Sequence, residues 1–135
     1  MPTSAAGTFI VAIESQTPYE KFDGASLGRV SINKQFSGDL EGTSRVEMLS
    51  AITDVKGSAG YVAIERVTGA LHGKRGTFVL QHSGTMNRAA ADLSVTVVPD
   101  SGTGELVGLA GRMTIDIVDG RHLYTFDHSI GEPVA

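Results

Sequence analysis

The segment that most constrains the fold spans residues 61–86, YVAIERVTGALHGKRGTFVLQHSGTM. Two runs rich in β-branched and aromatic residues flank a basic stretch that contains Gly69, Gly73 and Gly76. Such side chains suit a pleated, half-buried strand, and glycine adopts positive φ at little steric cost. We therefore predict a β-hairpin that reverses its direction near His72 and Gly73.

This hairpin carries three polar side chains well inside its strands: Glu65, Gln81 and His82. Burying a polar group without a partner costs about 1–3 kcal/mol, so each of them faces solvent, pairs with another or lines a polar cavity. A reversal near His72 puts Glu65 opposite Leu80 or Gln81, and brings Gln81 or His82 within reach of it across the strands. A slip of one residue decides which of the two faces the interior.

Short alternating or apolar runs continue along the rest of the chain. They predict strands over residues 8–13, 28–36, 43–53, 89–98, 106–109, 113–118 and 122–130, with a two-residue turn at Asp119 and Gly120. Residues 14–24 are expected to form a loop in which Tyr19 and Phe22 pack against the body of the protein. Lys34 falls on the apolar face of its strand, where it either snorkels or meets a cavity carboxylate.

No segment has helical periodicity over more than one turn. About eight antiparallel strands joined by tight turns favour one domain, residues 1–135, that closes into an eight-stranded antiparallel β-barrel, because closure removes the exposed strand edges. A barrel of this size is filled by side chains or holds one small ligand. A two-sheet sandwich is the alternative.

Composition excludes several classes of function. The net charge is −4 and the basic residues are scattered, which argues against a nucleic-acid-binding protein. The chain has no cysteine, so disulfides and cysteine-based catalysis are excluded. The longest apolar run, residues 9–13, is too short to cross a bilayer, and residues 1–7 do not resemble the basic start of a signal sequence. We expect a cytoplasmic protein that does not bind membranes.

Several segments together resemble the DUF3224 family of uncharacterised bacterial proteins: KQFSGDLEGTS, the hairpin GYVAIERVTGALHGKRGTFVLQHSGTM, VTVVPDSGTGELVGLAG and HLYTFDHSI. The resemblance runs from Thr8 to Ile130. It implies a small antiparallel barrel similar to allene oxide cyclase, with dirigent proteins and a spirotetronate-forming cyclase as more distant relatives. In those proteins the barrel cavity holds a flexible apolar substrate and steers its ring closure. The resemblance supplies no catalytic motif.

Glu65 and His82 are the candidate catalytic residues. A carboxylate beside an imidazole in a partly apolar cavity can act as a general acid or base near neutral pH. The alternative is a purely structural network in which Glu65 pairs with Arg66, Lys34 or a turn amide.

Aromatic and polar side chains on the last strand suggest a binding wall. Tyr124, Phe126 and His128 share a face with His122, and either line a cavity or are ordinary core aromatics with histidines at the wet strand ends. The predicted substrate-binding residues are Tyr61, Gln81, Tyr124, Phe126 and His128. The four histidines lack the spacing of a metal site, so we predict neither a metal nor another cofactor.

Three functions fit these features. The first is a cofactor-free isomerase or cyclase that acts on a small, apolar, oxygenated molecule in the barrel cavity. The second is a non-catalytic binding or carrier protein, and the third is a filled structural barrel. Apolar residues on both faces of the strand at residues 62–67 also suggest that a second subunit covers the outer surface. We expect a homo-oligomer, with a dimer favoured over a trimer.

Overall fold

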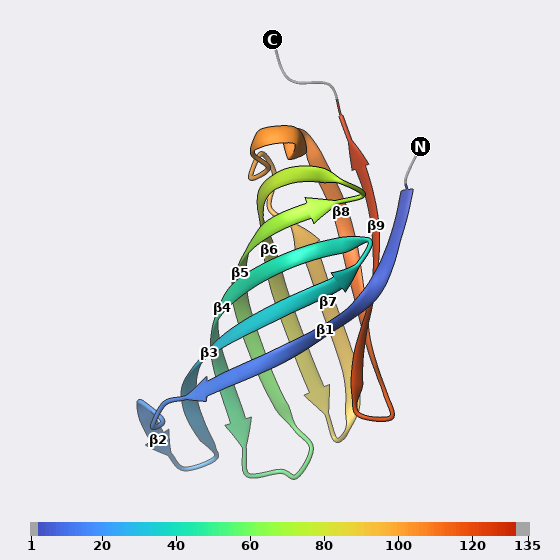
Figure 1. Cartoon of the computed structure of the whole chain (residues 1–135). Coiled ribbons are helices and arrows are strands. Elements are labelled where there is room, and N and C mark those ends of the chain that lie inside the picture. Colours follow the sequence, from blue (N-terminus) through green and yellow to red (C-terminus); the bar gives the residue numbers. More distant parts are fainter. Residues whose placement is uncertain (1–2, 132–135) are drawn as a thin grey trace.

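The computed structural model describes residues 3–131 and is built almost entirely of antiparallel strands (Figure 1). The elements in chain order are β1 (Thr3–Ser15), β2 (Glu20–Phe22), β3 (Ala25–Gly38), β4 (Leu40–Thr53), β5 (Ala59–Leu71), β6 (Lys74–Asn87), β7 (Ala90–Val97), the 3₁₀ turn η1 (Gly104–Leu106), β8 (Leu109–Val118) and β9 (Arg121–Ile130).

The sheet closes on itself. From β3 to β9 each strand pairs with the next, and β1 pairs with both β9 and β3. Eight strands therefore form a closed antiparallel barrel, which confirms the predicted architecture, while the short β2 adds only to the edge of β3. The pairing between β7 and β8 is the thinnest part of the wall, with the single registered pair Thr96 and Arg112.

The β5–β6 hairpin reverses at the predicted position and adopts one of the two registers left open by the sequence. His72 and Gly73 form its turn with φ of 48° and 80°, the two positive values that a type I′ turn requires. This turn places Glu65 opposite Leu80. Asp119 and Gly120 form the predicted two-residue turn between β8 and β9 in the same way, with φ of 52° and 77°.

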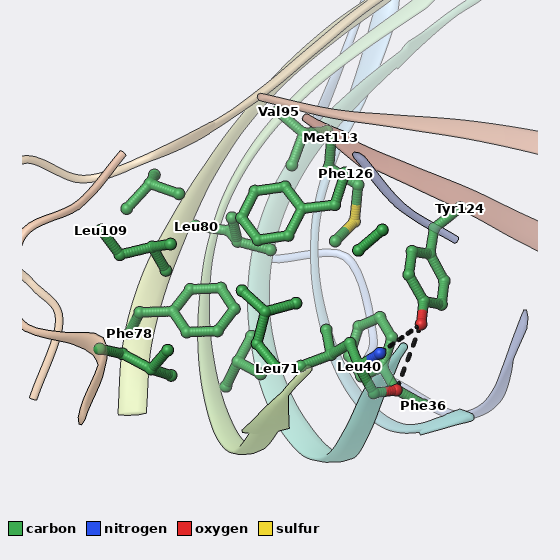
Figure 2. Close-up of a cluster of buried hydrophobic side chains, with 14 of the residues drawn as sticks. Phe36, Leu40, Leu71, Phe78, Leu80, Val95, Leu109, Met113, Tyr124 and Phe126 are labelled. Atoms are coloured by element: carbon green, nitrogen blue, oxygen red, sulfur yellow. Dashed lines mark hydrogen bonds between the residues drawn. The ribbon is translucent and has the colours of Figure 1, made fainter. Parts of the chain in front are cut away.

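One end of the barrel is filled by apolar side chains (Figure 2). This closed end carries η1 and the β5–β6 turn, and Leu106 of η1 is completely buried there. Phe78 stacks on Phe126 with ring centroids 5.8 Å apart. The buried cluster comprises Ala5, Phe9, Phe36, Leu40, Val67, Leu71, Phe78, Leu80, Val95, Val97, Leu106, Leu109, Met113, Tyr124 and Phe126.

The side chain of Tyr124 connects β9 to the turn between β3 and β4 through hydrogen bonds. Its hydroxyl oxygen accepts a hydrogen bond from the backbone N–H of Leu40 at 2.9 Å and lies 3.0 Å from the carbonyl oxygen of Ser37, to which it donates. Gly7 makes this approach possible, because a Cβ atom there would lie 2.0 Å from that same carbonyl oxygen and 2.6 Å from the tyrosine hydroxyl. The closed end is thus tied by contacts between distant parts of the chain.

The opposite end of the barrel is open. Side chains alternate along a strand, so the register places Ile13, Met86, Leu93 and Ile117 on the inner face. These four inner residues are nevertheless exposed, Ile117 by 67% and Ile13 by 59%. We call this end the mouth. Its inner wall is apolar and reaches solvent.

Two sequence expectations are wrong. Tyr19 and Phe22 do not pack against the body of the protein but are 60% and 55% exposed, because β2 pairs only with β3 and lies outside the barrel. Residues 106–109 do not form one strand: Leu106 ends η1 and β8 begins at Leu109. Within the described residues no helix has the length and apolar character needed to cross a membrane.

Candidate functional site

Four polar side chains from four neighbouring strands meet inside the barrel: Lys34 of β3, Ser44 of β4, Glu65 of β5 and His82 of β6. All four are buried, and Glu65 has no exposed surface. The strand registers bring them together, because Lys34 lies opposite Ser44, and His82 lies one inner position beyond Leu80, the partner of Glu65. We call this set the polar cluster. It lies on the inner face of the barrel, between the apolar core and the mouth.

The carboxylate of Glu65 is the centre of the polar cluster. Its Oε1 atom lies 3.1 Å from Nζ of Lys34 and 2.7 Å from Nε2 of His82, and its Oε2 accepts a 2.5 Å bond from the hydroxyl of Ser44. Burial alone would raise the pKa of this carboxyl. The hydrogen bond from His82, the charge of Lys34 and the bond from Ser44 outweigh burial, so that the pKa of Glu65 is lowered. Glu65 is therefore an anion at neutral pH.

Lys34 supplies the matching positive charge. Its Nζ atom lies 4.6 Å from the ring centroid of Phe9 and 5.9 Å from that of Phe36, so the ammonium also has favourable cation–π contacts. One anion and one cation balance each other in the polar cluster.

The bond to Glu65 fixes how His82 presents its second nitrogen. A carboxylate can only accept, so Nε2 carries the proton and Nδ1 has a free lone pair. Every fully buried side-chain nitrogen or oxygen in residues 3–131 has a hydrogen-bond partner, and the contact of His82 is made through Nε2. Nδ1 must therefore reach accessible space, where it can accept a proton from another molecule.

Tyr61 lies next to His82, with ring centroids 6.4 Å apart. The side chain is partly buried, and burial together with the negative charge of Glu65 raises the pKa of its phenol. Tyr61 therefore remains protonated and can donate a hydrogen bond to an oxygen atom. Its place on the inner face, one position beyond Ala63, is toward the mouth.

The other four predicted binding residues lie elsewhere. Gln81 is exposed on the outer face of β6, because the register turns His82 inward. The hydroxyl of Tyr124 is occupied by backbone groups, and Phe126 is completely buried in the core. His128 lies at the closed end beside His72, with ring centroids 5.5 Å apart. The predicted substrate-binding residues therefore do not form one site. They are divided between the surroundings of the polar cluster, the apolar core, the outer surface and the closed end.

The cluster also contains two residues beyond the catalytic pair named from the sequence. Lys34 had a sequence signal, since a lysine on an otherwise apolar face needs a carboxylate or a route to water. The only sequence signal for Ser44 is its position two residues before Val46, which places it on the same inward face. Any serine in a strand can occupy such a position, so this signal is not specific. The described residues contain no group of three or more histidine, cysteine, aspartate or glutamate side chains able to hold a metal ion.

The outer surface of the barrel is also hollowed. A groove of about 770 Å³ runs over β1, β3, β4 and β5, and a second of about 500 Å³ runs over β3, β4, β5 and β6. Glu47 and Ile64 line both. Leu49 pairs directly with Val62, and these two side chains and Ile64 form an exposed apolar patch on β4 and β5.

Comparison with known proteins gives a family but no activity. The sequence model of DUF3224, described as a protein of unknown function, matches residues 5–128. A crystal structure of a protein with unknown function from the DUF3224 family of Shewanella oneidensis MR-1 is 47% identical, with a TM-score of 0.93, and the match covers 98% of this chain and 100% of that chain. No curated protein matches the chain. The chain belongs to the DUF3224 family.

Proposed function

We propose that this barrel binds a small, apolar, oxygenated molecule in its mouth, and that His82 transfers a proton on that molecule without a cofactor. The observation that carries the proposal is the placement of His82. Its ring faces the interior of the barrel, its Nε2 lies 2.7 Å from Oε1 of Glu65, and its Nδ1 is left to meet a ligand.

The proton transfer follows from the roles of the three groups. A C–H bond between a carbonyl and an alkene of the ligand breaks, its proton passes to Nδ1 of His82, and its electron pair is delocalised onto the carbonyl oxygen. Glu65 holds the ring in the required tautomer and stabilises the imidazolium that forms, as a positioning residue. Lys34 keeps Glu65 anionic. Return of the proton to a different carbon completes an isomerisation that needs no oxidant or reductant.

The mouth supports this role through its shape and chemistry. Its inner wall is formed by apolar residues such as Ile13, Leu93 and Ile117, which favour an apolar ligand and exclude water from the reacting atoms. Tyr61 stands beside His82 and is suited to donate a hydrogen bond to a ligand oxygen. The resemblance to allene oxide cyclases belongs to this proposal: walls that fold a flexible ligand would also hold two of its carbons close enough for a ring closure.

The two other functions have weaker support. A carrier would use the same mouth but would not need a histidine base held by a buried carboxylate. A filled structural barrel agrees with the closed end, where Tyr124 and Phe126 are packed in the core. It does not agree with the mouth, where Leu93 is 38% exposed and Met48 is only partly buried.

The test has a binding step and a proton-transfer step. Native mass spectrometry of the purified protein, compared with the mass after denaturation, detects a retained small molecule. A panel of apolar cyclic ketones is then incubated with the protein in D₂O, and exchange of the protons next to the carbonyl is followed by NMR. We expect exchange above the buffer rate for ketones that bind.

Two variants and a control decide between the functions. His82→Gln should abolish the exchange and leave binding in place, and Glu65→Gln should slow it. His72→Asn, at the closed end, serves as the matched control and should exchange like the unsubstituted protein. Exchange that survives in His82→Gln would refute the assignment of the base. Binding without exchange by the unsubstituted protein would favour the carrier.

A further inference from the structure

A second pocket lies at the closed end of the barrel, on the far side of the apolar core from the polar cluster. It has a volume of about 410 Å³ and forms where the β5–β6 turn meets β1 and β9. Its lining residues are Thr3, Leu71, His72, Lys74, His128, Ser129 and Ile130.

The lining of this pocket is rich in hydrogen-bond donors and carries no carboxylate among the described residues. Lys74 is a cation, His72 and His128 carry imidazole nitrogens, and Thr3 carries a hydroxyl group. Ser129 occupies an outward position of β9. Only Leu71 and Ile130 are apolar. A pocket lined in this way attracts an anion, and its described lining has no negatively charged side chain to neutralise a bound cation.

His128 is the buried member of the set. It is 5% exposed and packs on Phe126 with ring centroids 5.1 Å apart. Its Nδ1 lies 3.2 Å from the carbonyl oxygen of Phe126, which can only accept, so Nδ1 carries a proton. Since every fully buried polar side-chain atom of residues 3–131 has a partner, Nε2 reaches the accessible space of the pocket. A ligand oxygen there would be met by an N–H once the ring is protonated.

The acidic side chains in the neighbouring elements are turned away or occupied. Asp39 accepts a bond from the backbone N–H of Ala6 at 2.9 Å, and Glu105 accepts one from the backbone N–H of Arg75 at 3.1 Å. Asp127 of β9 and Glu41 of β4 occupy outward positions of their strands and are exposed. Among residues 3–131, the positive groups of the pocket therefore have no carboxylate partner within it.

We propose that this pocket binds a phosphate-type oxyanion, either inorganic phosphate or the phosphate of a monoester. Such a group presents several acceptor oxygens and up to two negative charges, which match one ammonium, two imidazoles and the hydroxyl of Thr3. The site is independent of the proposed proton transfer, because Leu80, Phe78 and Phe126 lie between the two places.

The test uses the full chain labelled with ¹⁵N and the four histidine side chains as reporters. Inorganic phosphate is titrated at pH 6 and constant ionic strength, with sodium chloride as the reference salt. The ring signals of His72 and His128 should move and saturate, and those of His82 and His122 should stay in place.

Lys74→Gln is the primary variant, since Lys74 is exposed and its replacement leaves the core untouched. It should weaken phosphate binding about tenfold, in line with the loss of one charge-assisted contact. Lys56→Gln, in the turn at the opposite end, is the matched control and should bind like the unsubstituted protein. His128→Gln should weaken binding further, provided that its circular dichroism spectrum shows a folded barrel.

The remaining outcomes are equally decisive. Tighter binding of glycerol 3-phosphate than of inorganic phosphate would identify a site for a phosphate monoester, and the reverse order a site for the free anion. Equal shifts of all four histidines, no saturation, or unchanged affinity in Lys74→Gln would overturn the proposal. So would saturable binding of Zn²⁺ to His72 and His128 in the absence of any phosphate binding.

Discussion

Replacing Glu65 by glutamine tests the electrostatics of the polar cluster most directly. Glutamine keeps the shape of the side chain but only one acceptor oxygen, so it can accept from His82 or from Ser44 but not from both at their present positions. It also leaves the ammonium of Lys34 without its counter-charge. The side chains of the pair are 7% and 0% exposed and lie 3.1 Å apart. Breaking a buried pair from one side costs about 3–5 kcal/mol, so Glu65→Gln should lose that much free energy of unfolding.

The double variant Lys34→Met with Glu65→Gln separates charge from packing. Methionine keeps an unbranched apolar stem beside Phe9, and no net charge stays buried. Replacing a buried ion pair by neutral groups of similar volume is often neutral or stabilising. We therefore expect the double variant to regain at least about 2 kcal/mol of the loss caused by Glu65→Gln.

Urea unfolding followed by far-ultraviolet circular dichroism is the suitable assay, because the chain has no tryptophan. A loss of about 4 kcal/mol corresponds to a fall of about 2 M in the urea midpoint at a typical slope. The matched control is Glu47→Gln, which breaks the exposed 3.2 Å pair with Arg45 and should leave the midpoint almost unchanged. A double variant as unstable as the sum of its single variants would refute the reasoning.

Three further predictions follow from the geometry. Because the pKa of Glu65 is lowered, its carboxylate stabilises the fold above the ordinary pKa of 4.5, and this stability is lost as the pH falls from that value toward the lowered pKa. The variant Lys34→Met with Glu65→Gln should lack this component of the acid-unfolding curve. An acid-unfolding curve identical to that of the unsubstituted protein would contradict this role of Glu65. Tyr124→Phe removes the acceptor of the buried Leu40 N–H and should cost about 1–3 kcal/mol in urea unfolding, whereas Tyr19→Phe on the exposed loop should cost nothing measurable. The homodimer expected from the sequence would cover the apolar patch of Leu49, Val62 and Ile64. Ile64→Asp should then lower the sedimentation coefficient to that of a monomer. A dimer that persists in this variant would place the interface elsewhere.

The sequence predicts the hairpin and its turn, and it limits the register to two alternatives that differ by one residue. Once His72 and Gly73 form the reversal, the opposition of Glu65 and Leu80 is fixed by counting along both strands. Strand alternation then identifies Val67, Phe78 and Leu80 as inner residues. Counting from His72 and Gly73 places Gln81 on the outer face and His82 on the inner face. This distinction requires the position of the turn to be known to the exact residue.

The polar cluster could be predicted only in part, since it depends on three consecutive strand pairings. Lys34 meets Glu65 only if β3, β4 and β5 each adopt the observed register, and an error of one residue in either pairing separates them. The hydrogen bonds of the Tyr124 hydroxyl could not be predicted from the sequence for a similar reason. Its partner Leu40 is 84 residues away, and alternation along β9 does not reveal that the hydroxyl meets backbone groups.

The stability of the double variant also bears on why the polar cluster exists. A barrel of this size can be completed by apolar side chains, as its closed end demonstrates with Phe78, Leu80 and Phe126. The fold does not require an ion pair halfway along the barrel or exposed isoleucines on the inner wall of the mouth. If Lys34→Met with Glu65→Gln folds as stably as the unsubstituted protein but no longer exchanges ketone protons, the cluster serves chemistry and not folding. If the double variant folds stably and exchanges ketone protons as fast as the unsubstituted protein, the ion pair of Lys34 and Glu65 has no part in the proposed proton transfer.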